Sequence, residues 1–180
     1  MIDSGESRRL RLGPEPAERP SGIGVVRFAV SCEGNADTVL RNSREVMEVV
    51  LRFSARDWPS PSAWRLLLPT WFIAKCAPEM SLEEAERSLE MWRKLSPDEQ
   101  IEQERQAVWS LADWKHWMHP NERQWSWWEA RVDRPNQLFV AVVVSEWPFA
   151  WGALSWLLRA SGALYVAPEN DNPAAELDRQ

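Results

Sequence analysis

Cysteine, histidine and glycine are scarce in this chain, and each scarcity argues against a class of protein. Two cysteines and two histidines among 180 residues are too few for a disulfide scaffold or for a zinc site with paired ligands. The seven glycines form no phosphate-binding loop, since Gly22 and Gly24 precede the first expected strand and a dinucleotide fingerprint follows one. We interpret Cys32 and Cys76 as buried, reduced thiols.

Long apolar runs and long basic runs are also lacking. The longest apolar run, Leu138 to Val144, is far too short to span a bilayer, and the polar stretch from Met1 to Pro20 has no apolar core of a signal peptide. The net charge of −6 works against attraction to phosphate backbones and anionic membranes. The sequence therefore predicts a cytoplasmic protein without a nucleic-acid or membrane partner, and its Arg-rich, Lys-poor composition indicates a bacterial origin.

Catalytic motifs are missing as well: no GxSxG, HExxH or CxxC occurs. This absence favours a non-enzymatic protein and leaves the enzyme question open. His116 and His119 are spaced to share a helix face, where Asp113 or Glu122 could complete an acid–base or metal site. Nothing in the sequence places a nucleophile or a further ligand beside these histidines, so we predict no catalytic residues, no metal and no cofactor.

The remaining composition is typical of one globular domain, with 44% hydrophobic and 27% charged residues. We predict a mobile N-terminal tail over residues 1–21, a single α+β domain over residues 22–167, and a mobile acidic tail over residues 168–180. Alternation predicts strands at Gly22 to Cys32 and after Pro120, and an apolar run without alternation predicts a strand covered on both faces at Leu138 to Val144.

Two helix starts are marked clearly. Ser81 with Glu84 forms a capping-box pattern, and Ser96 precedes a proline at the first helical position. Each predicts a helix within a long first crossover between strands. The resulting order indicates a two-layer α+β fold with helices packed on a small mixed sheet, and its strand sequence is that of the ferredoxin-like βαββαβ arrangement with extra helices in the first crossover. That topology centres the first and third strands.

Tryptophan is the main excess, with thirteen residues. One interpretation is an aromatic core with arginines stacked over indole rings. The other is an exposed interaction surface, because a half-exposed strand cannot bury tryptophans on both faces. We expect at least two of the five tryptophans in this candidate surface to be exposed and adjacent. The candidate interaction residues are Trp125, Trp127, Trp128, Trp151, Trp156, Arg123 and Arg131.

Two further features suggest contacts. The helix expected from Pro148 to Ala160 carries a single charge and is apolar all round, which favours an intersubunit or partner contact in a thin domain. Acidic residues concentrate between Glu79 and Glu104, either as a solvated helix face or as a surface for a basic partner.

The sequence favours a small acidic protein-binding module, such as an immunity- or antitoxin-like inhibitor, with a protein partner or self-association. The alternatives are an enzyme with a Trp-lined pocket, using His116 or His119 with Asp113 or Glu122, and a sugar-binding module.

Overall fold

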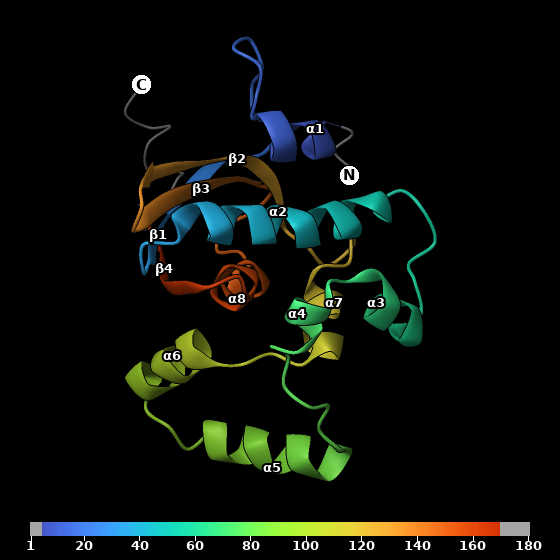
Figure 1. Cartoon of the computed structure of the whole chain (residues 1–180). Helices are drawn as coiled ribbons and strands as arrows, with labels where there is room; N and C mark the ends of the chain where they lie inside the picture. Colours follow the sequence, from blue (N-terminus) through green and yellow to red (C-terminus); the bar gives the residue numbers. More distant parts are fainter. Residues whose placement is uncertain (1–4, 170–180) are drawn as a thin grey trace.

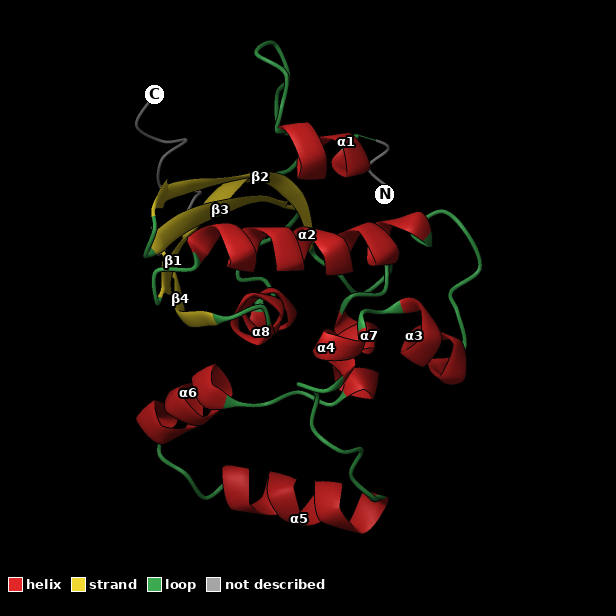
Figure 2. Ribbon diagram, in the orientation of Figure 1, coloured by secondary structure: helices red, strands yellow, loops and turns green. Residues whose placement is uncertain are grey.

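A four-stranded antiparallel sheet is the framework of the protein, for which a computed structural model describes residues 5–169. Eight helices surround the sheet within those residues (Figures 1 and 2). The elements in chain order are α1 (Glu6–Leu12), β1 (Gly24–Cys32), α2 (Ala36–Arg52), α3 (Pro61–Leu67), α4 (Thr70–Ile73), α5 (Leu82–Trp92), α6 (Pro97–Gln106), α7 (Leu111–Trp117), β2 (Trp125–Arg134), β3 (Gln137–Val144), α8 (Gly152–Ala160) and β4 (Ala163–Pro168). The α+β class is confirmed, and no helix among these residues is long and apolar enough to cross a bilayer.

The strand order is β2-β3-β1-β4, with β1 and β3 central as predicted. Every neighbouring pair is antiparallel, so the expectation of a mixed sheet was wrong. The reason is that the crossover from β1 leads to β2 at the far side of β3. Parallel strands are therefore separated by a strand that is antiparallel to both.

β3 is an internal strand with both faces covered, as its apolar sequence predicted. On the core face, Val140 lies opposite Phe28 and Val142 lies opposite Val26, and all four are buried. On the other face Val143 is 6% exposed. Burial on both sides explains why the strand does not alternate between apolar and polar residues.

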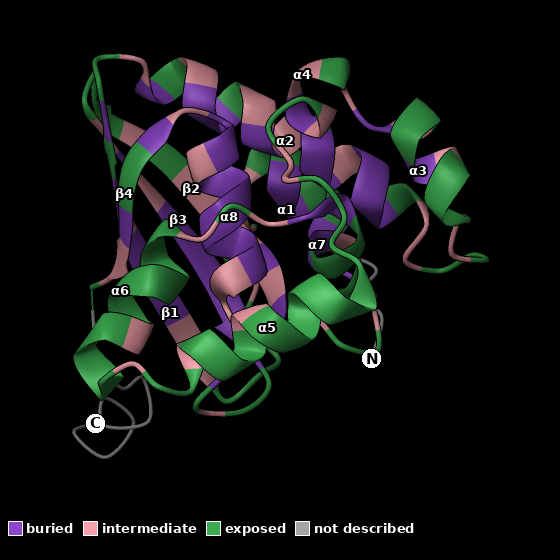
Figure 3. Cartoon of the chain, turned by 90° about the horizontal axis from the view of Figure 1, so that it is seen from below, coloured by how far each residue is buried: buried purple, intermediate pink, exposed green. Residues whose placement is uncertain are grey.

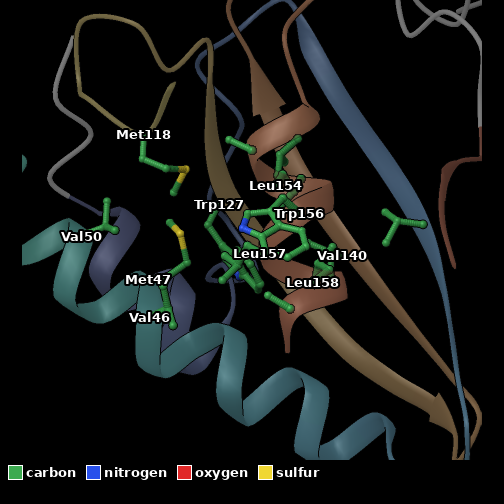
Figure 4. Close-up of a cluster of buried hydrophobic side chains, with 14 of the residues drawn as sticks. Val46, Met47, Val50, Met118, Trp127, Val140, Leu154, Trp156, Leu157 and Leu158 are labelled. Carbon is green, nitrogen blue, oxygen red and sulfur yellow. The ribbon is translucent and has the colours of Figure 1, made fainter. Parts of the chain in front are cut away.

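α8 is enclosed by the chain's own elements, which corrects the expectation of an intersubunit or partner contact. It contacts β4, α2, α6 and α7. Leu157 and Leu158 are fully buried, and Trp156 is nearly so, among side chains of α2 and the sheet (Figure 4). The Trp114 indole donates a hydrogen bond from α7 to the Ala153 carbonyl at 3.1 Å. Helices on the side of α8 away from the sheet make the domain thick enough to bury it all round.

The N-terminal segment belongs to the folded domain, although the sequence suggested a mobile tail up to residue 21. α1 packs along β2, with Leu10 fully buried and Glu6 and Arg9 nearly so (Figure 1). β4 ends at Pro168, and most of the expected C-terminal tail, residues 170–180, lies outside the described residues.

Candidate protein-interaction site

Residues 78–109 form an excursion whose two ends meet, and we call this segment the α5–α6 arm; within it, α6 contacts α8. A bridge between Ala77 and Ser110 closes its base, where the Ala77 N–H donates to the Trp109 carbonyl at 2.9 Å. α5 and α6 lie within the arm, and α5 is set apart from the rest of the fold (Figures 1 and 2). The arm is therefore an excursion from the domain with both ends held together.

The two helices of the arm are stabilised by their own caps, as the sequence predicted. The Ser81 N–H donates to the Glu84 carboxylate at 2.8 Å, and the Glu84 N–H donates to the Ser81 hydroxyl at 3.3 Å. Ser96 and Glu99 form the same capping box at the start of α6. These hydrogen bonds lower the pKa of the Glu84 and Glu99 carboxyls. Capping of this kind satisfies main-chain donors without any tertiary contact.

The apolar side chains of the arm face solvent. No residue of α5 or α6 is buried, and Figure 3 shows both helices as largely exposed. Leu82 is 85% exposed and Met91 is 64% exposed, and Leu89 on the same stripe as Leu82 is 45% exposed. Ile101 of α6 is exposed as well. A cluster of exposed large apolar side chains on one segment is typical of an interaction site.

The arm also carries much of the acidic charge. Residues 79–106 contain nine Asp and Glu residues against four Lys and Arg residues, in a chain of net charge −6. Glu86 and Glu90 lie within a turn of Leu89 on α5 and are exposed. Apolar side chains flanked by carboxylates complement an apolar surface with a basic rim.

The base of the arm is fixed to the core. The Trp109 ring packs so closely on Gly152 that a Cβ there would lie 2.7 Å from it. The Arg159 guanidinium donates to the Ala107 carbonyl at 2.7 Å and lies 5.3 Å from the centre of the Trp156 ring. At the other end of the arm, the Glu79 carboxylate accepts from the Ala112 N–H at 3.1 Å. α5 is thus presented on a rigid base.

The expected exposure of the tryptophan surface was wrong. Trp125, Trp127 and Trp156 are at most 5% exposed, and Trp128 and Trp151 are half-buried. A bulge in β2 between Trp127 and Glu129 interrupts the alternation of faces. α1 supplies further cover, and a guanidinium from it lies 5.0 Å from the Trp128 ring centre. The aromatic excess therefore serves mainly packing.

The two arginines of the predicted surface make different contacts. Arg123 forms a two-pronged salt bridge with Glu6, at 2.7 and 3.0 Å, and its guanidinium lies 5.1 Å from the Trp125 ring centre. Arg131 is exposed, and its guanidinium lies 5.6 Å from the Phe139 ring centre. Stacking of arginine over aromatic rings, the packing interpretation, is thus present at both sites. Contact of Arg131 with a partner stays a prediction.

The histidine constellation gains no support from the geometry. His119 accepts a hydrogen bond from the Asn121 N–H at 3.2 Å, and the Asp113 carboxylate accepts from the Ser110 hydroxyl at 2.9 Å. Neither the cavity of about 620 Å³ beside α1 nor a smaller one between β2 and Glu169 is lined by His116, His119, Asp113 or Glu122. Those residues also contain no group of three or more His, Cys, Asp or Glu side chains arranged to hold a metal ion.

Both cysteines are free thiols, with Cys32 buried and Cys76 half-buried. Burial raises the pKa of the Cys76 thiol to about 11, and it also raises the pKa of Cys32. Thiols with raised pKa values stay protonated at neutral pH and are poor nucleophiles. Neither cysteine is therefore suited to covalent catalysis.

Comparison of the chain with models of known protein families, with curated proteins and with solved structures finds no match in any of the three. Function therefore has to be inferred from the chemistry of the chain's own surfaces. The sequence interpretation did not identify Leu82 and Leu89 as exposed apolar residues. The available signal was that two short helices, each with a complete cap, follow one another through polar linkers and need no packing to form.

Proposed function

We propose that this protein is a small acidic binding module that docks a basic protein through the α5–α6 arm. The observation that carries the proposal is α5, a capped amphipathic helix with Leu82 and Leu89 exposed on one face and no residue buried. An amphipathic helix of this kind binds by laying its apolar face into a groove on the partner. The rigid base of the arm reduces the entropy lost on binding, because α5 is already presented as a helix.

The charge of the arm selects the chemistry of the partner. Nine acidic residues against four basic ones over residues 79–106 favour a groove rimmed by Lys and Arg. Two copies of the arm placed against each other would bring like charges together, which disfavours self-association through this surface. A nucleic-acid-cleaving toxin is basic where it binds phosphates, so an antitoxin-like inhibitor of such an enzyme is the role that the arm fits best.

Site-specific crosslinking tests the proposal. A photoreactive amino acid replaces Leu82 or Leu89 in cells, and Leu164, which is 62% exposed on β4, serves as the matched control position. We expect a basic protein to be crosslinked from α5 and not from residue 164. An acidic product, or the same product from residue 164, would contradict the proposal.

Measurements with the purified partner then test the contact itself. The double variant Leu82→Asp/Leu89→Asp should weaken binding by about a hundredfold or more, since central apolar anchors carry most of an interface's free energy. Leu164→Asp should leave binding unchanged. Affinity should also fall as salt is raised, because salt screens the charge attraction. Unchanged affinity of the double variant would reject the arm as the docking surface.

We also propose that the sheet follows the ferredoxin-like path, with α3 to α7 as additions to the first crossover. The strand order, with β1 and β3 central, supports this proposal. The bacterial cytoplasm fits a chain in which Cys32 and Cys76 are free thiols.

A further inference from the structure

A cavity of about 620 Å³ lies where α1, the end of α2, the start of β2 and the end of β3 meet. No residue of the α5–α6 arm lines it, so it is independent of the proposed docking surface. Its volume is in the range of small-molecule sites. Its polar lining comes from segments far apart in the sequence and is dominated by hydroxyl groups. The polar uncharged residues that line it are Ser7, Ser21, Ser54, Gln124, Ser126 and Ser145.

The charges in the cavity wall cancel. Glu6 and Arg123 both line it and form a salt bridge with distances of 2.7 and 3.0 Å. Their side chains are only 3% and 7% exposed. Glu6 also accepts from the Trp127 N–H at 2.6 Å. Because the guanidinium is already paired with a carboxylate, the residues that line the cavity offer no unpaired cation to a phosphate or carboxylate ligand.

Two polar groups of the lining residues lack a partner. The Ser54 hydroxyl and the Trp125 indole N–H are buried from solvent and make no hydrogen bond. Buried polar groups without partners are uncommon in folded proteins. Ser54 is thus a lining residue whose hydroxyl has no protein partner.

The wall of the cavity is held by main-chain hydrogen bonds. The Ile23 N–H donates to the Val144 carbonyl at 2.9 Å, and a Cβ at Gly22 would lie 2.1 Å from that oxygen. The Ser145 hydroxyl donates to the Gln124 carbonyl at 3.1 Å, and the Gln124 side chain accepts from the Ala150 N–H at 2.7 Å. The cavity is therefore formed before any ligand binds, which lowers the entropic cost of binding.

We propose that this cavity binds a neutral polyhydroxylated ligand of the size of one or two sugar rings. Clustered serine hydroxyls and an amide match the alternating donors and acceptors of sugar hydroxyls. Leu51 and Val143 add apolar side chains to the lining, against which the C–H groups of a sugar ring can pack. A purely apolar ligand would leave the hydroxyls without partners, and an anion would meet the Glu6 carboxylate.

The test uses the full chain and saturation-transfer NMR with glucose, N-acetylglucosamine, maltose and trehalose as probes, and with inorganic phosphate and benzoate as contrasting ligands. We expect at least one neutral sugar to bind and neither anion to do so. Ser54→Ala should weaken that binding by about tenfold without destabilising the fold, since the hydroxyl has no protein partner to lose. Ser7→Trp, a substitution at an exposed position on the cavity lining, should abolish binding by filling the space.

Ser31→Ala is the matched control, because Ser31 is exposed on β1 and does not line the cavity. It should leave sugar binding unchanged. Failure of all four sugars, preferential binding of an anion, or equal effects of Ser54→Ala and Ser31→Ala would each overturn the proposal. None of these outcomes bears on the α5–α6 arm, whose residues lie outside the cavity.

Discussion

α8 and α5 are amphipathic or apolar helices of similar length with opposite fates. Seven of the nine residues of α8 are buried, and its N-terminus has no side-chain cap. α5 has a complete capping box and no buried residue. Packing stabilises the first helix, whereas local hydrogen bonds stabilise the second. An apolar stripe behind a strong cap therefore does not have to lie in the core, because the helix can form without burying that stripe.

The same contrast predicts that the core and the arm differ in how substitutions change their stability. Substitutions around the sheet and α8 are expected to change global unfolding, because these elements share one apolar core. Substitutions in α5 are expected to change only local opening of the arm.

Arg123→Ala is expected to have the largest effect, since it strands the Glu6 carboxylate in a buried position. Removing one partner of a buried ion pair typically costs about 3–5 kcal/mol. The free energy of unfolding, from urea titration followed by tryptophan fluorescence, measures it. Arg131→Ala is the control, because Arg131 is exposed. Equal, small effects of both substitutions would show that α1 is not part of the cooperative core.

Leu157→Ala and Leu82→Ala compare α8 and α5 directly with the same chemical change. Leu157 is fully buried and Leu82 is 85% exposed. The first substitution should lower the free energy of unfolding by about 2–5 kcal/mol through lost burial and a residual cavity. The second should stay within about 0.5 kcal/mol. A comparable loss at Leu82 would mean that the arm is packed against something in solution, which would support self-association.

The elements that the sequence predicted well are those specified by neighbouring residues. The caps at Ser81 and Ser96 depend on residues three positions away, and the central position of β3 follows from its own apolar run. α1 escaped prediction because its stabilising contacts are distant. Glu6 and Arg9 bond the main chain of Trp127 on the edge strand β2, more than a hundred residues along the chain.

The burial of the candidate tryptophans could not be predicted for a related physical reason. Whether Trp125, Trp127 and Trp156 are exposed depends on which elements cover them, and a single-sequence pattern does not give the thickness of the domain. Once α1 and α8 are in place these tryptophans are buried. The acidic segment was identified, but the exposure of Leu82 and Leu89 depends on α5 standing away from the core. The caps show that α5 can form without packing, and they do not specify where it lies.

Ser81→Ala and Ser96→Ala should each cost about 1 kcal/mol of local helix stability. Because no residue of α5 or α6 is buried, the loss should appear as faster amide hydrogen exchange in the arm and leave the melting temperature of the core nearly unchanged. Ser88→Ala, in the middle of α5, is the control and should leave exchange unchanged or slower, since alanine favours a helix interior. A clear drop of the core melting temperature in the Ser81→Ala variant would show that the arm and the core unfold together.

Acid is expected to loosen α5 and α6 while leaving α8 intact, and this is the smallest effect. Hydrogen bonds with the main-chain N–H and the hydroxyl of Ser81 lower the pKa of the Glu84 carboxyl below 4.5. Hydrogen bonds with the hydroxyl and the main-chain N–H of Ser96 do the same for Glu99. A carboxyl whose pKa is lower in the folded state contributes stability above its unfolded pKa, and that stability is lost as the pH falls through the folded pKa. Amide exchange in α5 and α6 should therefore accelerate, relative to its intrinsic rate, below about pH 4.5.

Glu84→Gln/Glu99→Gln supplies the matched control, because glutamine can still accept from the cap and does not titrate in this range. In that variant the protection of α5 and α6 amides from hydrogen exchange should be slightly lower at neutral pH. Acid should no longer reduce this protection by protonating the two capping carboxylates. α8 offers the internal reference, since none of its residues is an acid. If the exchange of α8 accelerated in parallel with that of α5, acid would be acting on the whole fold, and the division between packed core and capped arm would be wrong.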